Sequence, residues 1–243
     1  DHILGFKGYN GKGEKIKSGG TVVKNVTGYD LSKLVTGSFG TLLVLSEITL
    51  KVLPMPVDTK TIIISGFSLE QSMGVIASAL SSSNDPSGAV FYPNDLRNNF
   101  VFNDLTHPGS ITAIRVEGTK TSTEERINNL ISNLALIDKN ITVLDSIQSE
   151  IFWEDTRSLK VFSKKQKNIL RAVVPVSETI NLINRLKTFH PTFFLDWGGS
   201  LIWLELDYLS NQKIDQIRRR ITEVGGYLTV IKSPENIKSS SEI

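Results

Sequence analysis

A short segment with two glycines, Gly37-Ser38-Phe39-Gly40-Thr41, has the residue types of a ligand-binding loop. Glycine lets the backbone adopt conformations that other residues avoid, and it leaves the neighbouring N–H groups uncovered. Uncovered N–H groups can approach a phosphate or a flat ring closely. The alternative is a tight turn without a ligand, because glycine marks turns more often than binding loops. Spacing alone leaves both interpretations open.

The elements on either side of this loop would position it. Residues 29–35 predict a short helix with apolar residues on one side, and Gly37 can end it. Residues 41–53 form a long apolar run rich in Val, Ile and Thr, which predicts a buried strand. Pro54 and Pro56 would end that strand. The loop therefore joins a helix to a strand.

Residues 19–54 carry a specific resemblance to a known family. They read Gly-Gly-Thr-Val-Val-Lys-Asn-Val-Thr-Gly-Tyr-Asp-Leu over 19–31, Gly-Ser-Phe-Gly-Thr-Leu over 37–42 and Glu-Ile-Thr-Leu-Lys-Val-Leu-Pro over 47–54. This string resembles the FAD-binding domain of the vanillyl-alcohol oxidase superfamily, which is of the p-cresol methylhydroxylase type. Within that superfamily it is most similar to the FAD-binding subunits of bacterial glycolate oxidases. Leu43 departs from the pattern, since many members have glycine there, so the backbone path beside a flavin is expected to differ slightly.

The resemblance implies which residues contact FAD. Backbone and hydroxyl groups of the glycine loop would face the cofactor, and the strand that follows would line the isoalloxazine ring. The implied FAD-contacting residues are Asn25, Gly28, Gly37, Ser38, Gly40, Thr41, Val44 and Leu45. Lys24 would face the cofactor or a subunit interface, unless it is an ordinary solvated lysine.

The composition excludes several other classes of function. A formal net charge of +2 over 243 residues argues against a nucleic-acid partner. The absence of cysteine excludes disulfides, thiolate metal sites, an iron–sulfur cluster in this chain and a cysteinyl flavin link. The three histidines are too scattered for a metal motif, so no metal ligands are expected. No apolar run approaches the roughly 20 residues of a transmembrane helix.

Two domains are expected. Residues 1–57 would form part of the FAD-binding domain, beginning with a hairpin over 2–18 whose turn is Asn10-Gly11-Lys12-Gly13. Residues 58–243 would form a cap, or substrate-type, domain. The family has a preceding part with a second glycine-rich loop for the pyrophosphate and a C-terminal tail, so we expect the chain to be a fragment that binds FAD poorly by itself.

The cap pattern predicts an α+β fold. Strands are expected at 59–66, 89–92, 111–116, 141–144, 170–174, 192–196, 201–206 and 227–231, with helices after the capping residues Ser68, Thr121 or Ser122, Ser177 and Ser210. The order strand, helix, strand, strand, helix, strand occurs twice, which predicts a duplicated ferredoxin-like unit with one antiparallel sheet. A loop is expected at 93–110, a linking helix at 147–158 and a frayed tail at 232–243.

Some cap residues could serve a substrate. Trp153 and Arg157, and Asp196 with Trp197, lie in segments that resemble the family's cap, and an arginine near a flavin can clamp a carboxylate. The alternative is a solvated Arg157 and tryptophans that only fill the core. His107 and His190 are expected to be surface residues rather than bases.

The resemblance implies an FAD-dependent subunit of a glycolate oxidase complex, which oxidises glycolate to glyoxylate. Its implied partners are a catalytic FAD subunit and an iron–sulfur subunit, and its location is the cytoplasm or the inner face of the membrane. No catalytic residue is identified, because the chain lacks a histidine cluster that could serve as a base. The alternatives are a stand-alone FAD-dependent 2-hydroxy-acid dehydrogenase and an interaction subunit that has lost FAD.

Overall fold

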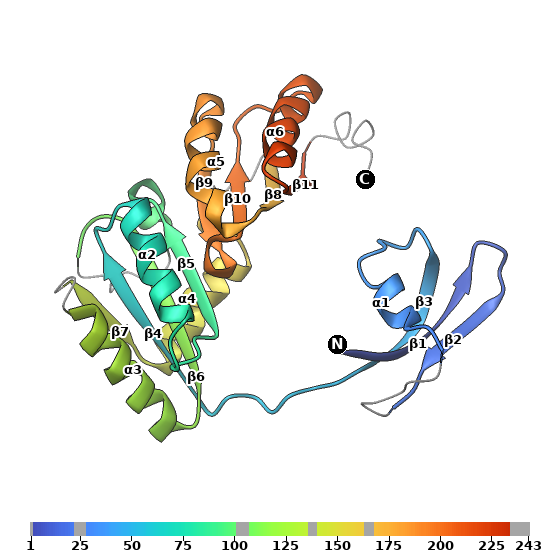
Figure 1. Cartoon of the computed structure of the whole chain (residues 1–243), viewed down its shortest axis with the longest axis horizontal. Helices are drawn as coiled ribbons and strands as arrows, with labels where there is room; N and C mark the ends of the chain where they lie inside the picture. The colour runs from blue at the N-terminus through green and yellow to red at the C-terminus, as the bar shows by residue number, and fades with distance from the viewer. Residues whose placement is uncertain (1, 22–27, 101–106, 136–139, 163–167, 234–243) are drawn as a thin grey trace. The chain divides into compact units, whose positions relative to one another are not determined.

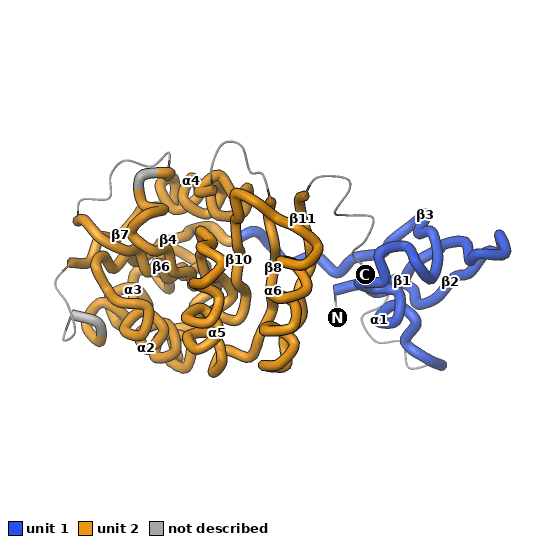
Figure 2. The backbone as a smooth tube through the Cα atoms, turned by 90° about the horizontal axis from the view of Figure 1, so that it is seen from above, with its two compact units in different colours: residues 1–55 blue, residues 56–243 orange. Residues whose placement is uncertain are grey.

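The structure is a computed structural model of the whole chain, and it describes all residues except 1, 22–27, 101–106, 136–139, 163–167 and 234–243 (Figure 1). The chain divides into two compact units, residues 1–55 and residues 56–243 (Figure 2). Each unit has its own sheet and its own hydrophobic core.

The first unit is a three-stranded antiparallel sheet with one short helix. Its strands are β1 (Ile3–Asn10), β2 (Lys15–Gly19) and β3 (Leu43–Leu50), in the order β2-β1-β3, and the helix is α1 (Leu31–Val35). The side chain of Asn10 accepts the N–H groups of Lys12 and Glu14 at 2.9 and 3.0 Å, which closes the predicted hairpin.

The prediction of a buried strand after the glycine loop is wrong for β3. The core of the first unit consists of Phe6, Val35 and Leu43, with Ile16 and Leu31 packed against them. Only Leu43 of β3 is buried, and the apolar residues Val44, Leu45, Ile48 and Leu50 are exposed. The physical reason is that β3 is an outer strand, while α1 packs over β1 and β2.

The second unit contains an eight-stranded antiparallel sheet in the order β11-β8-β10-β9-β5-β6-β4-β7. Its strands are β4 (Asp58–Ser65), β5 (Gly88–Tyr92), β6 (Ile111–Gly118), β7 (Ile141–Leu144), β8 (Ile169–Val173), β9 (Thr192–Asp196), β10 (Leu201–Glu205) and β11 (Tyr227–Lys232). All eight strands were predicted from the sequence, with ends that differ by one or two residues.

The sheet consists of two halves with the same topology. The first half runs β4, α2 (Leu69–Leu80), β5, β6, α3 (Lys120–Ala135), β7, and the second runs β8, α5 (Thr179–Leu186), β9, β10, α6 (Asn211–Glu223), β11. In each half the spatial order of the strands is fourth, first, third, second. This is the ferredoxin-like arrangement, so the predicted α+β fold and its duplication are confirmed. The halves meet at one paired position, Phe91 with Leu195.

Alternate residues of the inner strands pack in cores on opposite faces of the sheet. Ile62 and Ile64 of β4 pack with α2 and α3, whereas Ile63 packs on the other face with Phe152 of α4 (Ser146–Arg157). Ala172 of β8 packs with α5 and α6 on the same side as α2 and α3. Figure 2 shows α4 on the opposite side of the sheet from these four helices. We call the side that carries α4 the α4 face.

The capping predictions were only partly correct. Ser68 forms the predicted capping box with Gln71, and the hydroxyl of Ser210 accepts the N–H of Lys213. Thr121 and Ser122 do not cap α3, because the helix already begins at Lys120, close behind the end of β6.

Ser177 does not cap α5 either. It lies within a 3-10 turn, η2 (Val176–Glu178), which follows Pro175, and the α-helix begins only at Thr179. Further 3-10 turns are η1 (Asn94–Asn99), inside the predicted loop, η3 (Lys187–Phe189) and η4 (Trp197–Gly199).

Candidate functional site

The glycine loop of the first unit is a tight turn with three residues in the left-handed region. The φ angles are +80° at Gly37, +52° at Phe39 and +78° at Gly40. The N–H of Ser38 donates to the carbonyl of Val35 at 3.2 Å, and the N–H of Thr41 donates to the carbonyl of Ser38 at 2.9 Å. The loop is therefore held by its own backbone directly after α1.

This turn leaves backbone donors available. Within the part of the chain that the structure describes, the N–H groups of Gly37, Phe39 and Gly40 have no protein acceptor. A Cβ atom on Gly37 or Gly40 would meet nothing within 4 Å, so both glycines are needed for their backbone conformation rather than for space. The loop can offer N–H groups to a phosphate or to the polar edge of a ring. The residues present fit an anionic or flat ligand.

The other residues predicted to contact FAD are distributed around this loop. Val44 and Leu45 lie in β3 opposite Tyr9 and Gly8 of β1, and Val44 is 68% exposed. Gly28 has a φ of +80° and is exposed. The hydroxyl of Thr41 donates to the carbonyl of Ser38 at 2.7 Å and serves the turn. Asn25 and Lys24 lie outside the described residues.

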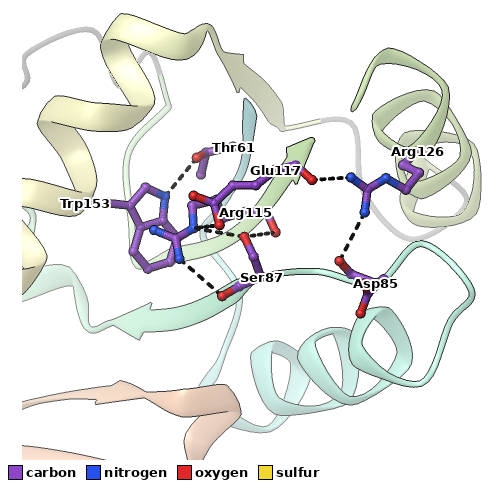
Figure 3. A network of polar contacts seen from close by, with 7 residues as sticks. All are labelled: Thr61, Asp85, Ser87, Arg115, Glu117, Arg126 and Trp153. Atoms are coloured by element: carbon purple, nitrogen blue, oxygen red, sulfur yellow. Dashed lines mark hydrogen bonds and ion pairs between the residues drawn. The ribbon is translucent and has the colours of Figure 1, made fainter. Parts of the chain in front are cut away.

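In the second unit, Trp153 lies on the α4 face in a network of polar contacts (Figure 3). Its indole N–H donates to the hydroxyl of Thr61 at 2.9 Å, and its ring lies 4.7 Å from the guanidinium carbon of Arg115. Arg115 also donates to the hydroxyl and the carbonyl of Ser87 at 3.0 and 3.2 Å and pairs with Glu117 at 3.4 Å. These contacts occupy Arg115 and support a structural role for Trp153.

A second arginine, Arg126, forms hydrogen bonds in the same region. Arg126 of α3 donates to the carbonyls of Asn84 and Asp85 at 3.1 and 3.3 Å, and also to the carbonyl of Glu117. These bonds tie α3 to the loop between α2 and β5 and to the end of β6 (Figure 3). Arg157, by contrast, is exposed at the end of α4 and pairs with Glu154 one turn earlier. Its position supports the alternative of a solvated arginine.

Asp196 and Trp197 stand together at the end of β9. The carboxylate of Asp196 accepts the N–H of Trp197 at 2.7 Å. Burial raises the pKa of Asp196 above its ordinary value, and the Trp197 N–H, Arg115 and Arg171 oppose this effect only in part. Trp197 has a φ of +51° and is 58% exposed, so it is not the core residue that the alternative interpretation supposed.

Sequence reasoning missed Arg171 of β8. Its guanidinium carbon lies 4.9 Å from the ring of Trp197, on the α4 face of the sheet. The signal was present, because Arg171 is a charged residue within the apolar strand Ile-Leu-Arg-Ala-Val. Only the strand register shows that it shares a face with Asp196.

The histidines do not form a catalytic group. His107 lies in a turn and is half-buried, while His190 is exposed and ends η3 with a φ of +51°. Among the described residues, no three His, Cys, Asp or Glu side chains are grouped as a metal site would require. None of the described helices is both long enough and apolar enough to cross a bilayer.

The sequence match to a known protein covers both units. The chain is 28% identical over 230 residues to glycolate oxidase subunit GlcE of Escherichia coli (strain K12), covering 94% of this chain and 54% of GlcE. The chain is a sequence relative of GlcE. It spans about half of that protein's length. A second relative is glycolate oxidase subunit GlcD of Bacillus subtilis (strain 168), 38% identical over 63 residues, which are 26% of this chain and 13% of GlcD.

The resemblance to glycolate oxidase subunits is thus confirmed beyond residues 19–54, since the match to GlcE includes most of the second unit. Other relatives, matched over 38% of this chain, carry the name FAD-linked oxidoreductase. No protein-family model matches the chain.

The solved structures agree with the fold prediction. The chain is similar to p-cresol methylhydroxylase with bound substrate, with a TM-score of 0.61 and 9% identity, over 92% of this chain and 55% of that protein. At this identity the likeness concerns the fold alone. The fold is therefore of the p-cresol methylhydroxylase type, as the sequence predicted.

Proposed function

We propose that this chain is the FAD-binding subunit, or a large part of it, of a glycolate oxidase complex that converts glycolate to glyoxylate. The observation that carries the proposal is the similarity to GlcE over 94% of the chain. On this proposal, residues 1–57 belong to the FAD-binding domain and residues 58–243 form the cap. The protein acts as an oxidoreductase component in the cytoplasm or at the inner face of the membrane.

The glycine loop would help to hold the cofactor. The free N–H groups of Gly37, Phe39 and Gly40 suit the phosphates or the polar edge of a flavin, and Ser38 and Thr41 adjoin them. The exposed strand β3 would offer Val44 and Leu45 as an apolar surface for the ring. FAD, when bound, would supply a redox-active ring that accepts electrons and passes them on.

The residues that could accept a proton indicate which subunit of the complex performs the oxidation. Oxidation of a hydroxy acid requires a base for the hydroxyl proton. The described histidines, His2, His107 and His190, are far apart in the sequence and form no group. We therefore assign proton removal to a partner, a catalytic FAD subunit, and onward electron transfer to an iron–sulfur subunit.

The proposal is tested by co-expression with the two partner subunits. We expect the purified complex to contain FAD in this subunit and to reduce an artificial dye when glycolate is added. Omission of this chain should abolish glycolate-dependent dye reduction and should lower the flavin recovered per complex. Full activity and full flavin content without this chain would contradict the proposal. Activity of this protein alone, without partners, would favour the stand-alone dehydrogenase.

A further inference from the structure

The sheet of the second unit ends in a strand with one unpaired side. β11 is the last strand in the spatial order and, among the described residues, it pairs only with β8. In an antiparallel outer strand, every second residue directs its N–H and C=O groups away from the sheet. The outer side of β11 can therefore form hydrogen bonds with one more strand.

This edge lacks the features that usually prevent strand pairing. Residues 227–231 carry no charge, and the charged residue of the strand, Lys232, is its last one. Tyr227 and Ile231 are 54% and 41% exposed. The bulge in the pairing with β8 comes only after Val230, so the strand is regular before it. Charges, prolines or bulges within the strand would be expected on an edge that stays unpaired.

The helix that packs on β11 has one side without a neighbouring helix. The buried residues Ile214, Ile217 and Ile221 of α6 face the sheet. Arg220 and Glu223 of α6 form a hydrogen bond and an ion pair with α5. Residues three and four apart share one side of a helix. The side away from α5, which we call the outer flank of α6, is formed by Asn211, Asp215, Arg218 and Thr222.

The helices and the strands of this half have matching spacings. Neighbouring strands lie about 4.8 Å apart, so two strands occupy about 10 Å, which is close to the distance between two packed helices. Accordingly, the two helices α5 and α6 cover four strands (Figure 2). A second copy that paired its β11 with this β11 would place its own α6 about one helix spacing from the outer flank. Strand pairing and helix packing would then occur together.

The outer flank is complementary to itself in charge. Arg218 and Asp215 lie on it, with side chains 34% and 66% exposed and 3.6 Å apart. The middle of α6 is Ile217, so two antiparallel α6 helices that overlap fully bring Arg218 of each copy close to Asp215 of the other. Leu228 and Val230, which are only partly buried beneath α6, would be covered at the same time.

We propose that β11 and the outer flank of α6 form a two-fold interface between two copies of this chain, which join their sheets into one. In this interface β11 pairs with itself in the antiparallel direction. The pairing must be centred on a residue, because only then does each side chain stay on its own face of the sheet. Thr229 is the middle of residues 227–231, so it lies opposite Thr229 of the second copy. The proposed glycolate oxidase complex would then contain two copies of this subunit.

The first test uses the absence of cysteine, because a single introduced thiol reports its contacts without background. The purified full chain should show a reversible monomer–dimer equilibrium in analytical ultracentrifugation. Thr229→Cys should form a disulfide-linked dimer under mild oxidation. The matched control is Val143→Cys on β7, the outer strand at the other end of the sheet, which is 39% exposed. This control should stay mainly monomeric in the same oxidation.

The second test exchanges the charges of the outer flank. Arg218→Asp brings carboxylates of the two copies together and should weaken the dimer about tenfold. Asp215→Arg combined with Arg218→Asp restores the opposite charges and should dimerise as the wild type does. A different protein bound at this edge would not be expected to tolerate the double exchange. Circular dichroism checks that each variant is folded, and Thr229→Cys provides the test if the charge variants unfold.

Three results would overturn the proposal. They are a monomer at all concentrations, equal disulfide formation by Thr229→Cys and Val143→Cys, and a double charge variant that dimerises as weakly as Arg218→Asp. Each of these measurements is made without glycolate and without partner subunits. A failure of this interface is therefore distinguished from a failure of the proposed function.

Discussion

The indole N–H of Trp153 donates to the hydroxyl oxygen of Thr61 at 2.9 Å, across 92 positions of the sequence. Thr61 is completely buried in β4, and Trp153 lies on α4. Trp153→Phe would leave the hydroxyl of Thr61 without its donor, which should destabilise the protein by about 1–3 kcal/mol. Urea unfolding followed by circular dichroism measures this loss.

The matched control is the double variant. Thr61→Val alone removes the acceptor, and Thr61→Val combined with Trp153→Phe removes both groups. The double variant should be destabilised by clearly less than the sum of the single ones, because no buried polar group is then left unpaired. Strictly additive losses would show that this hydrogen bond does not link α4 to the sheet.

Gly40 provides the test of the flavin loop. With a φ of +78°, Gly40→Val would add roughly 1–3 kcal/mol of backbone strain and place a branched side chain beside the free N–H groups. We expect the full-length protein with this substitution to bind less flavin while the cap stays folded. The control is Gly11→Val in the hairpin turn, where the new Cβ also meets nothing within 4 Å. Unchanged flavin loading in the Gly40 variant would return the loop to an ordinary turn.

Asp196 should make stability depend on pH in an unusual direction. Burial raises its pKa in the folded protein above the ordinary 3.8, so the folded state holds the proton more tightly than the unfolded chain does. Stability from this group is therefore complete below 3.8 and falls as the pH rises through the folded pKa. Asp196→Asn should stabilise the protein at neutral pH, and the gain should vanish near pH 3–4.

Asp58 serves as a control, because its pKa is shifted in the opposite direction to that of Asp196. Burial alone would raise its pKa, but hydrogen bonds from Ser146 and Thr123 outweigh it, and the pKa is lowered. Its contribution is present above the unfolded pKa and is lost as the pH falls. Asp58→Asn should therefore destabilise the protein at neutral pH and less so in acid. Thermal unfolding of both variants between pH 3 and pH 8 decides whether the two effects have opposite signs.

His107 and His190 separate a supporting subunit from a stand-alone catalyst. His190 has a φ of +51°, a conformation that Asn adopts more easily than Ala, so we choose His107→Ala with His190→Asn. If a partner removes the proton, glycolate-dependent dye reduction by the complex should stay within about twofold of wild type. A loss of about 10²–10⁴-fold at normal flavin content, as expected for a missing general base, would support the stand-alone enzyme.

The sequence predicted the second unit well because its signals are local. Short apolar runs of β-branched residues such as Ile62-Ile63-Ile64 indicate strands, and the Ser68–Gln71 capping box fixes the start of α2. The wrong assignments at Thr121 and Ser177 have a common cause. Serine and threonine near a helix start offer several equivalent caps, and the neighbouring strand end or proline decides which one is used.

The candidate sites were less predictable because they depend on long-range pairing. An apolar run such as β3 has the same composition whether another layer covers it or not, so its exposure was not visible in the sequence. Arg171 lies within an apolar strand, and only the register that aligns it with Trp203 places it on the face of Asp196. The glycine loop was found from its residues, but the role of its N–H groups stays a prediction.

The single registered pair between β5 and β9, Phe91 with Leu195, has a consequence for how the second unit comes apart. Within each half, continuous backbone hydrogen bonds join the strands. Between the halves, side chains make most of the contacts, among them Tyr92, which stacks on Phe194 at 4.9 Å. Side-chain packing yields to small rotations more readily than a ladder of hydrogen bonds does. On heating, the two halves should therefore separate first between β5 and β9. Amide hydrogen exchange in β9 should then speed up at a lower temperature than exchange in the outer strands β7 and β11.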